Sequence, residues 1–262
     1  MIHLYGFILG LAMVIGVYLI QLQAKKQNVN LPGFDYLIWA VLLGGVIGAR
    51  VYHVITDYYL YQYAFWDIFK IWQGGLGIIG AVIGGVIAVW GWLKINKSNQ
   101  IFGWLKINKI NKQLNLLTIL DLAVFGLPVA QAIGRWGNFF NQELYGLPTS
   151  LPWGIYIDFI NRLPGYENFS HFHPLFFYEM VLMLVFAGLV WWMVRQERFS
   201  GFSIGSGKWF LFYIFYYSFI RFWLDFIRID KMQFFNTGLC INQVFLIIVM
   251  IIMGRYWFRK KQ

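Results

Sequence analysis

The sequence predicts an all-α integral membrane protein, built as a bundle of seven transmembrane helices. Of its 262 residues, 60% are apolar and only 12% are charged, and the mean hydropathy is +0.60. No soluble domain of this length could bury so much apolar surface in one core. The net charge is +10, and the basic residues lie in loops between apolar runs. Orientation of the chain in a membrane explains this distribution better than nucleic acid binding does.

Seven apolar runs are long enough to cross the hydrocarbon core of a bilayer. They are Ile2–Gln21, Tyr36–Ile55, Gly77–Leu93, Leu116–Ile133, Leu175–Val194, Trp209–Leu224 and Leu239–Met253. The first run has no basic residue before it and no small-residue cleavage site after it. We therefore expect an uncleaved helix there, and not a signal peptide.

The basic residues predict the orientation of this bundle. With the N-terminus outside, inside segments hold fourteen of the 21 lysines and arginines: Lys25, Lys26, Lys94, Lys97, Lys106, Lys109, Lys112, Arg195, Arg198, Lys208, Arg255, Arg259, Lys260 and Lys261. Such an excess of positive charge is typical of cytoplasmic loops. The distribution favours an outside N-terminus and an inside C-terminus.

Two loops differ from simple connections. The heptapeptide GWLKINK occurs at Gly91–Lys97 and again at Gly103–Lys109, so the cytoplasmic loop of about residues 94–115 is interpreted as a local expansion. The outside segment of about residues 136–172 contains three prolines and no spanning run. We expect it to form a small irregular extracytoplasmic cap on a single membrane domain, residues 1–262.

Several ionisable side chains lie within the spans or at their edges, where a charge at mid-bilayer costs roughly 2.5–3.5 kcal/mol. They are Arg50, His53, Asp121, Arg135, Glu143, Glu179, Arg221, Asp225 and Arg228. Most fall at the outer ends of their helices on the topology above. Polar groups from four helices are therefore predicted to converge at one depth and to form a site.

Spacing refines this prediction. Arg221, Asp225 and Arg228 are four and three residues apart, so they share one helical face; a self-neutralising ion pair is the alternative interpretation. Asp121 precedes Arg135 by about four helical turns, and both face the bundle interior if the helix stays regular past Pro128. Asp121 is expected to be structural.

The residue types favour a phosphate-binding site over a metal site. His53, His171 and His173 have no ligand spacing with a carboxylate, and Cys240 is the single cysteine, so neither a metal site nor a disulfide is predicted. Arginine holds phosphate in bidentate geometry, and neighbouring glycines let the backbone approach. In a membrane, the expected phosphate is that of a lipid head group.

The stretch GRWGNFFNQELYG, residues 134–146, resembles the signature of the prolipoprotein diacylglyceryl transferase family. Every fixed position of that signature is matched: Gly134, Arg135, Gly137, Asn138, Phe139, Asn141, Glu143 and Gly146. Six further blocks resemble the family in the right order: IHLYG, GGVIGARVYHV, WQGGLGIIGAVIGG, LPWGIYI, HPLFFYE and RFWLDFIR. The resemblance covers nearly the whole chain apart from the duplicated loop.

The resemblance implies a seven-helix fold with an outside N-terminus, in agreement with the charge count. It implies transfer of a diacylglyceryl group from phosphatidylglycerol to the lipobox cysteine of a prolipoprotein signal peptide, with release of glycerol phosphate. This places the chain, as a multi-pass protein, in a bacterial plasma (inner) membrane. Neither a metal nor an organic cofactor is implied, and the partners are membrane lipids and prolipoproteins, not nucleic acid.

Residue by residue, Arg135 and Arg221 match the family's two essential arginines, and Asn138 and Glu143 match other signature residues. We expect the phospholipid to be bound by Arg135, Asn138, Asn141, Arg221 and Arg50, and catalysis to involve Arg135, Arg221, Glu143 and Asp225. Supporting roles are expected for Asp121, His53, His173, Tyr178, Glu179 and Arg228.

Two positions depart from the family pattern. Asp225 stands where glutamate is more usual, and Ile79 stands where some members have a histidine proposed as a base. Either that histidine is not required for the chemistry, which we favour because other members also have an apolar residue there, or another group accepts the thiol proton in this chain. Glu143 is the first candidate, Asp225 the second and His53 the third. Cys240 is expected to pack within the last span and to carry no covalent intermediate.

Two other functions fit the same features. A transporter or scramblase could move anionic lipid or solute through the polar cluster, and would give no covalent product. A structural membrane partner would have charges that satisfy one another, which does not explain their clustering at one depth or the excess of arginine.

Overall fold

The computed structural model describes residues 2–31, 33–98, 114–196, 199, 201–229 and 240–259. The second GWLKINK copy and the start of the last apolar run lie outside these residues. Contacts divide the chain into two compact units, one of Met1–Gln27 with Leu117–Gln262 and one of Asn28–Leu116. Each unit is described by itself.

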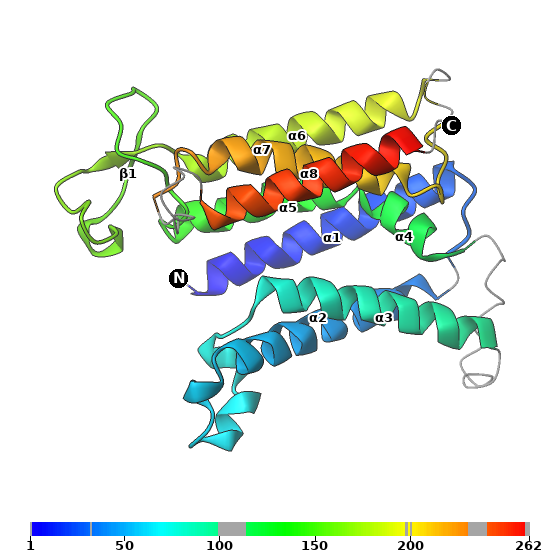
Figure 1. Ribbon diagram of the computed structural model, residues 1–262, viewed down its shortest axis with the longest axis horizontal. Coiled ribbons are helices and arrows are strands. Elements are labelled where there is room, and N and C mark those ends of the chain that lie inside the picture. Colours follow the sequence, from blue (N-terminus) through cyan, green and yellow to red (C-terminus); the bar gives the residue numbers. More distant parts are fainter. Residues whose placement is uncertain are drawn as a thin grey trace. The chain divides into compact units, whose positions relative to one another are not determined.

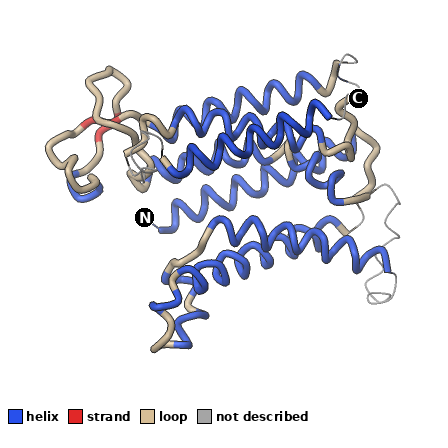
Figure 2. Tube along the Cα trace, in the orientation of Figure 1, coloured by secondary structure: helices blue, strands red, loops and turns tan. Residues whose placement is uncertain are grey.

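The first unit is a helical bundle (Figures 1 and 2). Its helices are α1 (Ile2–Lys26), α4 (Leu116–Ala123), α5 (Leu127–Phe140), α6 (Leu175–Met193), α7 (Lys208–Leu224) and α8 (Ile241–Arg259). Helix α5 packs against α1 and α6, and α7 packs against α6 and α8. Buried aromatic and aliphatic side chains of α6 and α7, among them Phe186, Val190 and Trp209, form much of its core.

The second unit is a helix pair, α2 (Phe34–Thr56) and α3 (Ile78–Ser98), joined by three short 3₁₀ helices: η1 (Tyr58–Leu60), η2 (Phe65–Phe69) and η3 (Ile71–Gln73). Glycines let the two backbones touch. A Cβ added to Gly48 would lie 2.2 Å from the carbonyl oxygen of Gly80, and one added to Gly84 would lie 2.1 Å from that of Gly44. Any larger residue would force the helices apart, which is a common use of small residues in membranes.

The predicted apolar runs are largely helical where the structure describes them; the exceptions are residues 124–126 of the fourth run and single residues at the ends of other runs. By length and hydropathy, Leu4–Lys26, Phe34–Thr56 and Leu175–Met193 are long and apolar enough to cross a membrane, and the bent pair α4–α5 makes a fourth if it forms one span. Among the described residues, Ile79–Ile95 and Asn242–Arg255 are apolar but too short to pass this test. The described chain is therefore a mostly helical protein with three or four membrane-capable segments.

The fourth run is not one regular helix. It breaks between Ala123 and Leu127, and α4 and α5 are bent by 51°. Pro128 is the reason, because proline has no N–H to donate and its ring clashes with the carbonyl four residues earlier, here that of Val124. The condition under which Asp121 and Arg135 were expected to share the interior face, a helix that stays regular past Pro128, is therefore not met. Helix α5 also continues to Phe140, so residues 136–140 of the expected loop are helical.

Asp121 caps the start of α7 from across the bundle. Its Oδ2 accepts the backbone N–H groups of Gly205 and Gly207, at 3.0 and 2.8 Å, and its Oδ1 accepts that of Phe210 at 3.1 Å. A carboxylate stabilises a helix N-terminus because it pairs with unsatisfied N–H groups and with the helix dipole. The fully buried Asp121 thus has the structural environment that the sequence predicts.

The segment between α5 and α6 contains regular structure that the sequence analysis did not expect. Strand β1 (Ile155–Tyr156) pairs antiparallel with β2 (His171–Phe172), with Ile155 opposite Phe172. Bridges connect Gly146 with Arg228 and Pro148 with Phe172. Tyr145, Ile157 and Phe172 form a small buried core there. We call residues 141–174 the cap; it projects from the end of the bundle where α5 ends and α6 begins (Figure 1).

Candidate active site

A buried carboxylate on α6 joins two arginines from neighbouring helices. Glu179 is 2% exposed; its Oε1 accepts Arg135 Nη2 from α5, and its Oε2 accepts Arg221 Nη1 from α7 at 2.9 Å. A buried carboxylate must be paired, because an isolated charge loses its hydration. Glu179 therefore fixes the separation of Arg135 and Arg221, and the site depends on it more than its expected supporting role implied.

A second carboxylate lies directly after α7. Asp225, 1% exposed, is 3.3 Å from Arg221 Nη2 and 3.9 Å from Arg228 Nη1. Only Arg221 is within α7, because the helix ends at Leu224. The single helical face predicted for the three residues is therefore not formed, although they still meet as ion pairs, which was the alternative interpretation. Asn242 of α8 also donates to Asp225 Oδ2. We call Arg135, Glu179, Arg221, Asp225 and Arg228 the arginine cluster.

The signature motif adds an amide bridge to this cluster. Asn138 Oδ1 accepts Arg135 Nη1 at 3.3 Å, while its Nδ2 donates to Glu143 Oε1 at 2.8 Å. Asn141 Nδ2 lies 3.5 Å from the same oxygen. Glu143 is exposed whereas Asn138 is buried, so a chain of polar groups leads from solvent to the buried arginines.

Close packing explains why two positions of the signature motif are occupied by glycine. A Cβ at Gly137 would lie 2.4 Å from the ring of Tyr5, which packs from α1 onto α5. A Cβ at Gly146 would lie 2.7 Å from the carbonyl oxygen of Ile227. At both positions a larger side chain would displace the motif from its neighbours.

His173 and Tyr178 lie beside the cluster without joining it. The Tyr178 hydroxyl is 3.1 Å from His173 Nδ1 and accepts the indole N–H of Trp153 at 2.8 Å. His173 also packs its Cβ near Gly146. These groups connect the start of α6 to the cap, and this geometry gives them a supporting position.

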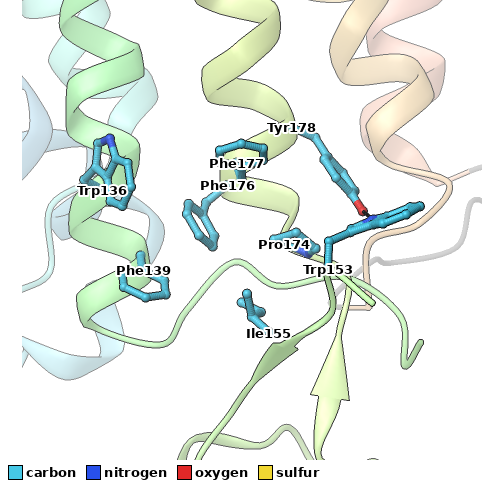
Figure 3. Close-up of a pocket in the computed structure, with 8 residues that line it drawn as sticks. All are labelled: Trp136, Phe139, Trp153, Ile155, Pro174, Phe176, Phe177 and Tyr178. Carbon is cyan, nitrogen blue, oxygen red and sulfur yellow. Dashed lines mark hydrogen bonds between the residues drawn. The ribbon is translucent and has the colours of Figure 1, made fainter. Parts of the chain in front are cut away.

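An apolar groove is lined by residues of α5, the start of α6 and the cap (Figure 3). Its volume is about 610 Å³, and it is lined by Trp136, Phe139, Trp153, Ile155, Pro174, Phe176, Phe177 and Tyr178. The rings of Phe139 and Phe176 lie 5.4 Å apart, one helical turn from Arg135 and Glu179 respectively. An amphiphile with its charged group at the arginines would thus find apolar surface one turn away.

Arg50 and His53 lie in the second unit. The Arg50 guanidinium donates to four backbone carbonyls of the connecting segment: those of Ile68 and Gly74 at 2.7 Å, Gly75 at 3.0 Å and Asp67 at 2.5 Å. His53 Nδ1 is 2.9 Å from Asp57. Both residues line a polar pocket of about 210 Å³. Ile79 is an exposed residue of α3.

The sequence analysis gave no site role to three residues that the structure places near the cluster or the cap. Asn242 and Gln142 hydrogen-bond to cluster and cap residues, but neither type is informative by itself. Cys240 is distant in sequence, yet its Sγ lies 3.9 Å from Asp225 Oδ2. Cys240 and Asp225 are separated along the chain, and the packing of α8 on α7 brings them together. No local sequence pattern could therefore reveal this contact.

The cluster is suited to an anionic group. Three guanidinium groups contact two buried carboxylates, which leaves one positive charge before the exposed Glu143 is counted. Each guanidinium has five N–H donors in a planar fork, whereas the contacts above engage two nitrogens each of Arg135 and Arg221. Further donors at these two residues are available for phosphate oxygens, and arginine recognises phosphate in this way.

These features define a helical membrane protein with partly buried arginines around two buried carboxylates and an apolar groove on the helices that carry two of these residues, an arrangement that fits an anionic amphiphile. The sequence profile of the prolipoprotein diacylglyceryl transferase family matches residues 1–259. The chain belongs to this family.

Curated relatives carry the name phosphatidylglycerol–prolipoprotein diacylglyceryl transferase. The one from Cutibacterium acnes is 38% identical over 237 residues, covering 87% of this chain and 71% of the relative. The Synechocystis sp. protein is 35% identical over 233 residues, with 87% and 75% covered. The Thermotoga maritima protein is 34% identical over 232 residues, with 88% and 72% covered.

Proposed function

We propose that this chain transfers the diacylglyceryl group of phosphatidylglycerol to the thiol of the lipobox cysteine in prolipoproteins. The observation that carries the proposal is the Arg135–Glu179–Arg221 arrangement, positioned by the signature motif of a family whose relatives bear that activity in their names. The proposed setting is a bacterial inner membrane, crossed seven times with the N-terminus outside and the cap on the extracytoplasmic face.

In the proposed reaction, the substrate thiolate attacks the glyceryl carbon that carries the phosphate ester. A C–S bond forms, the C–O bond breaks, and its electron pair leaves with glycerol phosphate. Arg135 and Arg221 bind the phosphate and stabilise the charge that grows on its oxygens as the bond breaks. Their shared contact with Glu179 holds both forks in place before the substrate arrives, so little reorganisation is needed.

The thiol must also lose its proton. At a reference pKa of about 8.5, a thiol is mostly protonated at neutral pH. We assign the proton acceptor to Glu143, because its carboxylate is exposed and is joined to Arg135 through Asn138. Asp225 is a poorer base, since it is buried between Arg221 and Arg228. His53 is the third candidate, and Ile79 cannot accept a proton.

Mass spectrometry of a lipobox peptide, incubated with the purified protein and phosphatidylglycerol, tests the proposal. We expect a diacylglyceryl mass increment on the peptide cysteine and release of an equal amount of glycerol phosphate. A peptide with serine in place of that cysteine is the control. Movement of lipid across vesicles without any peptide adduct would favour a transporter or scramblase instead.

A further inference from the structure

Glu143 lies on a stretch of backbone that is held in an unfavourable conformation. The residues on either side of it, Gln142 and Leu144, have φ angles of 52° and 54°, in the left-handed region that side-chain-bearing residues seldom adopt. At Gln142 two backbone hydrogen bonds at the end of α5 hold this conformation: the Gln142 N–H donates to the carbonyl of Phe139 and the Glu143 N–H to that of Asn138, both at 3.0 Å, a common way for a helix to end on a left-handed residue. Side-chain contacts add to these two bonds.

The side chain of Gln142 makes them to one turn of the cap. Its Oε1 accepts the backbone N–H of Asp158 at 2.7 Å and Asn161 Nδ2 at 3.0 Å, and its Nε2 donates to Asp158 Oδ2 at 2.8 Å. Acceptor and donor are used at once, so the amide is held in one orientation. This arrangement, which we call the Gln142 clamp, connects the signature motif to η5 (Phe159–Asn161).

The Gln142 clamp helps to set the position of Glu143. With Gln142 left-handed, the Glu143 N–H reaches the carbonyl of Asn138 at 3.0 Å, and the Glu143 carboxylate reaches Asn138 Nδ2 at 2.8 Å. If Gln142 relaxed to a negative φ, the next residue would leave this position. Attachment of the cap does not itself need the clamp, because the Tyr145 hydroxyl also bonds the carbonyl of Asn161 and the N–H of Leu163.

We propose that Gln142 is a positioning residue for the transfer reaction: it holds Glu143 against Asn138, and through Asn138 against Arg135, by clamping the motif to the Asp158–Asn161 turn. This inference rests on the proposed function, and it makes the cap part of the reaction centre's support. It assigns a role to a position that varies within the signature motif.

A charge swap tests the clamp. Gln142→Glu places a carboxylate 2.8 Å from that of Asp158, and we expect kcat to fall about tenfold with little change in the KM for phosphatidylglycerol, since Glu143 loses its position. Adding Asp158→Asn restores a donor opposite the new carboxylate and should return kcat to within about threefold of the parental value. Asp158→Asn alone should stay near parental, because its amide oxygen can face Gln142.

A second comparison separates positioning from general stabilisation. In a Glu143→Gln background, Gln142→Glu should cause no further loss of kcat, because the residue through which it acts is already altered. Tyr145→Phe is the matched control: it removes two hydrogen bonds to the same cap turn, and its kcat should remain within about twofold while thermal stability falls. If Gln142→Glu does not fold, Gln142→Ala removes the clamp while keeping a residue with a Cβ at a φ of 52°, and kcat should fall in the same way.

The outcomes are distinct. If the parental protein forms no thioether on the peptide, the proposed function itself is wrong. With an active parent, the clamp is wrong if Gln142→Glu keeps its kcat, if Asp158→Asn gives no rescue, or if the loss adds fully to that of Glu143→Gln.

Discussion

Replacing Glu179 by glutamine keeps the shape of the side chain and removes the charge that Arg135 and Arg221 share. In the native site each oxygen of the Glu179 carboxylate accepts a hydrogen bond from one guanidinium group. Glutamine can accept one of them with its oxygen but presents an N–H₂ group to the other, so a donor faces a donor. One arginine must then turn away.

The size of the effect follows from burial, since Glu179 is 2% exposed. Removing one partner of a buried ion pair costs about 3–5 kcal/mol, and we expect the lower end, about 3 kcal/mol, because glutamine retains one of the two hydrogen bonds. That corresponds to a Tm lowered by roughly 6–12 °C for a chain of this size. Displacing one of the two arginines proposed to bind the phosphate should lower kcat about 100-fold.

Thermal unfolding in detergent micelles, followed by circular dichroism, measures the first quantity, and thioether formation measures the second. Glu167→Gln is the matched control, since that glutamate is an exposed residue of the cap; its Tm and kcat should stay near parental. If Glu179→Gln also kept both values, the two arginines would not be held by the shared carboxylate, and our account of the site would fail.

Four further predictions follow from the same contacts. Arg135→Lys should lower kcat by about 100-fold or more, because lysine lacks the planar fork; a near-normal rate would contradict bidentate phosphate binding. Glu143→Gln should lose most of its rate at neutral pH and regain part of it at high pH, where the substrate thiol ionises unaided; an unchanged pH–rate profile would reassign the base. Cys240→Ala should leave kcat intact with a modest loss of stability, and a lipid adduct trapped on Cys240 would indicate a two-step mechanism. Asp121→Asn should cost about 1–2 kcal/mol of stability, measured by thermal unfolding, through loss of the α7 cap, and a kcat loss at unchanged stability would give Asp121 a chemical role.

The sequence by itself determined the class of this protein and its main helices. Apolar run length and composition act locally, so the helical runs were predicted, although several helices extend beyond the predicted ends and the fourth run is broken into two helices. The four-residue spacing of Arg221 and Asp225 likewise predicted their ion pair, because residues four apart at the end of a helix are neighbours, whereas Arg228 lies beyond the end of α7. The signature motif named Arg135, Asn138 and Glu143 before any geometry was known.

Tertiary structure decided how those residues work together. The break before Pro128 follows from a rule that the sequence contains, but its 51° bend depends on what α4 and α5 pack against. Glu179 lies more than forty residues from each arginine it contacts, and the Gln142 clamp and the Cys240–Asp225 contact also cross between elements. Such contacts are set by helix packing and by the pairing of the cap strands, which no spacing along the chain encodes. The sequence therefore determined which chemical groups are present, and the packing of α5, α6, α7 and the cap decided which of them meet.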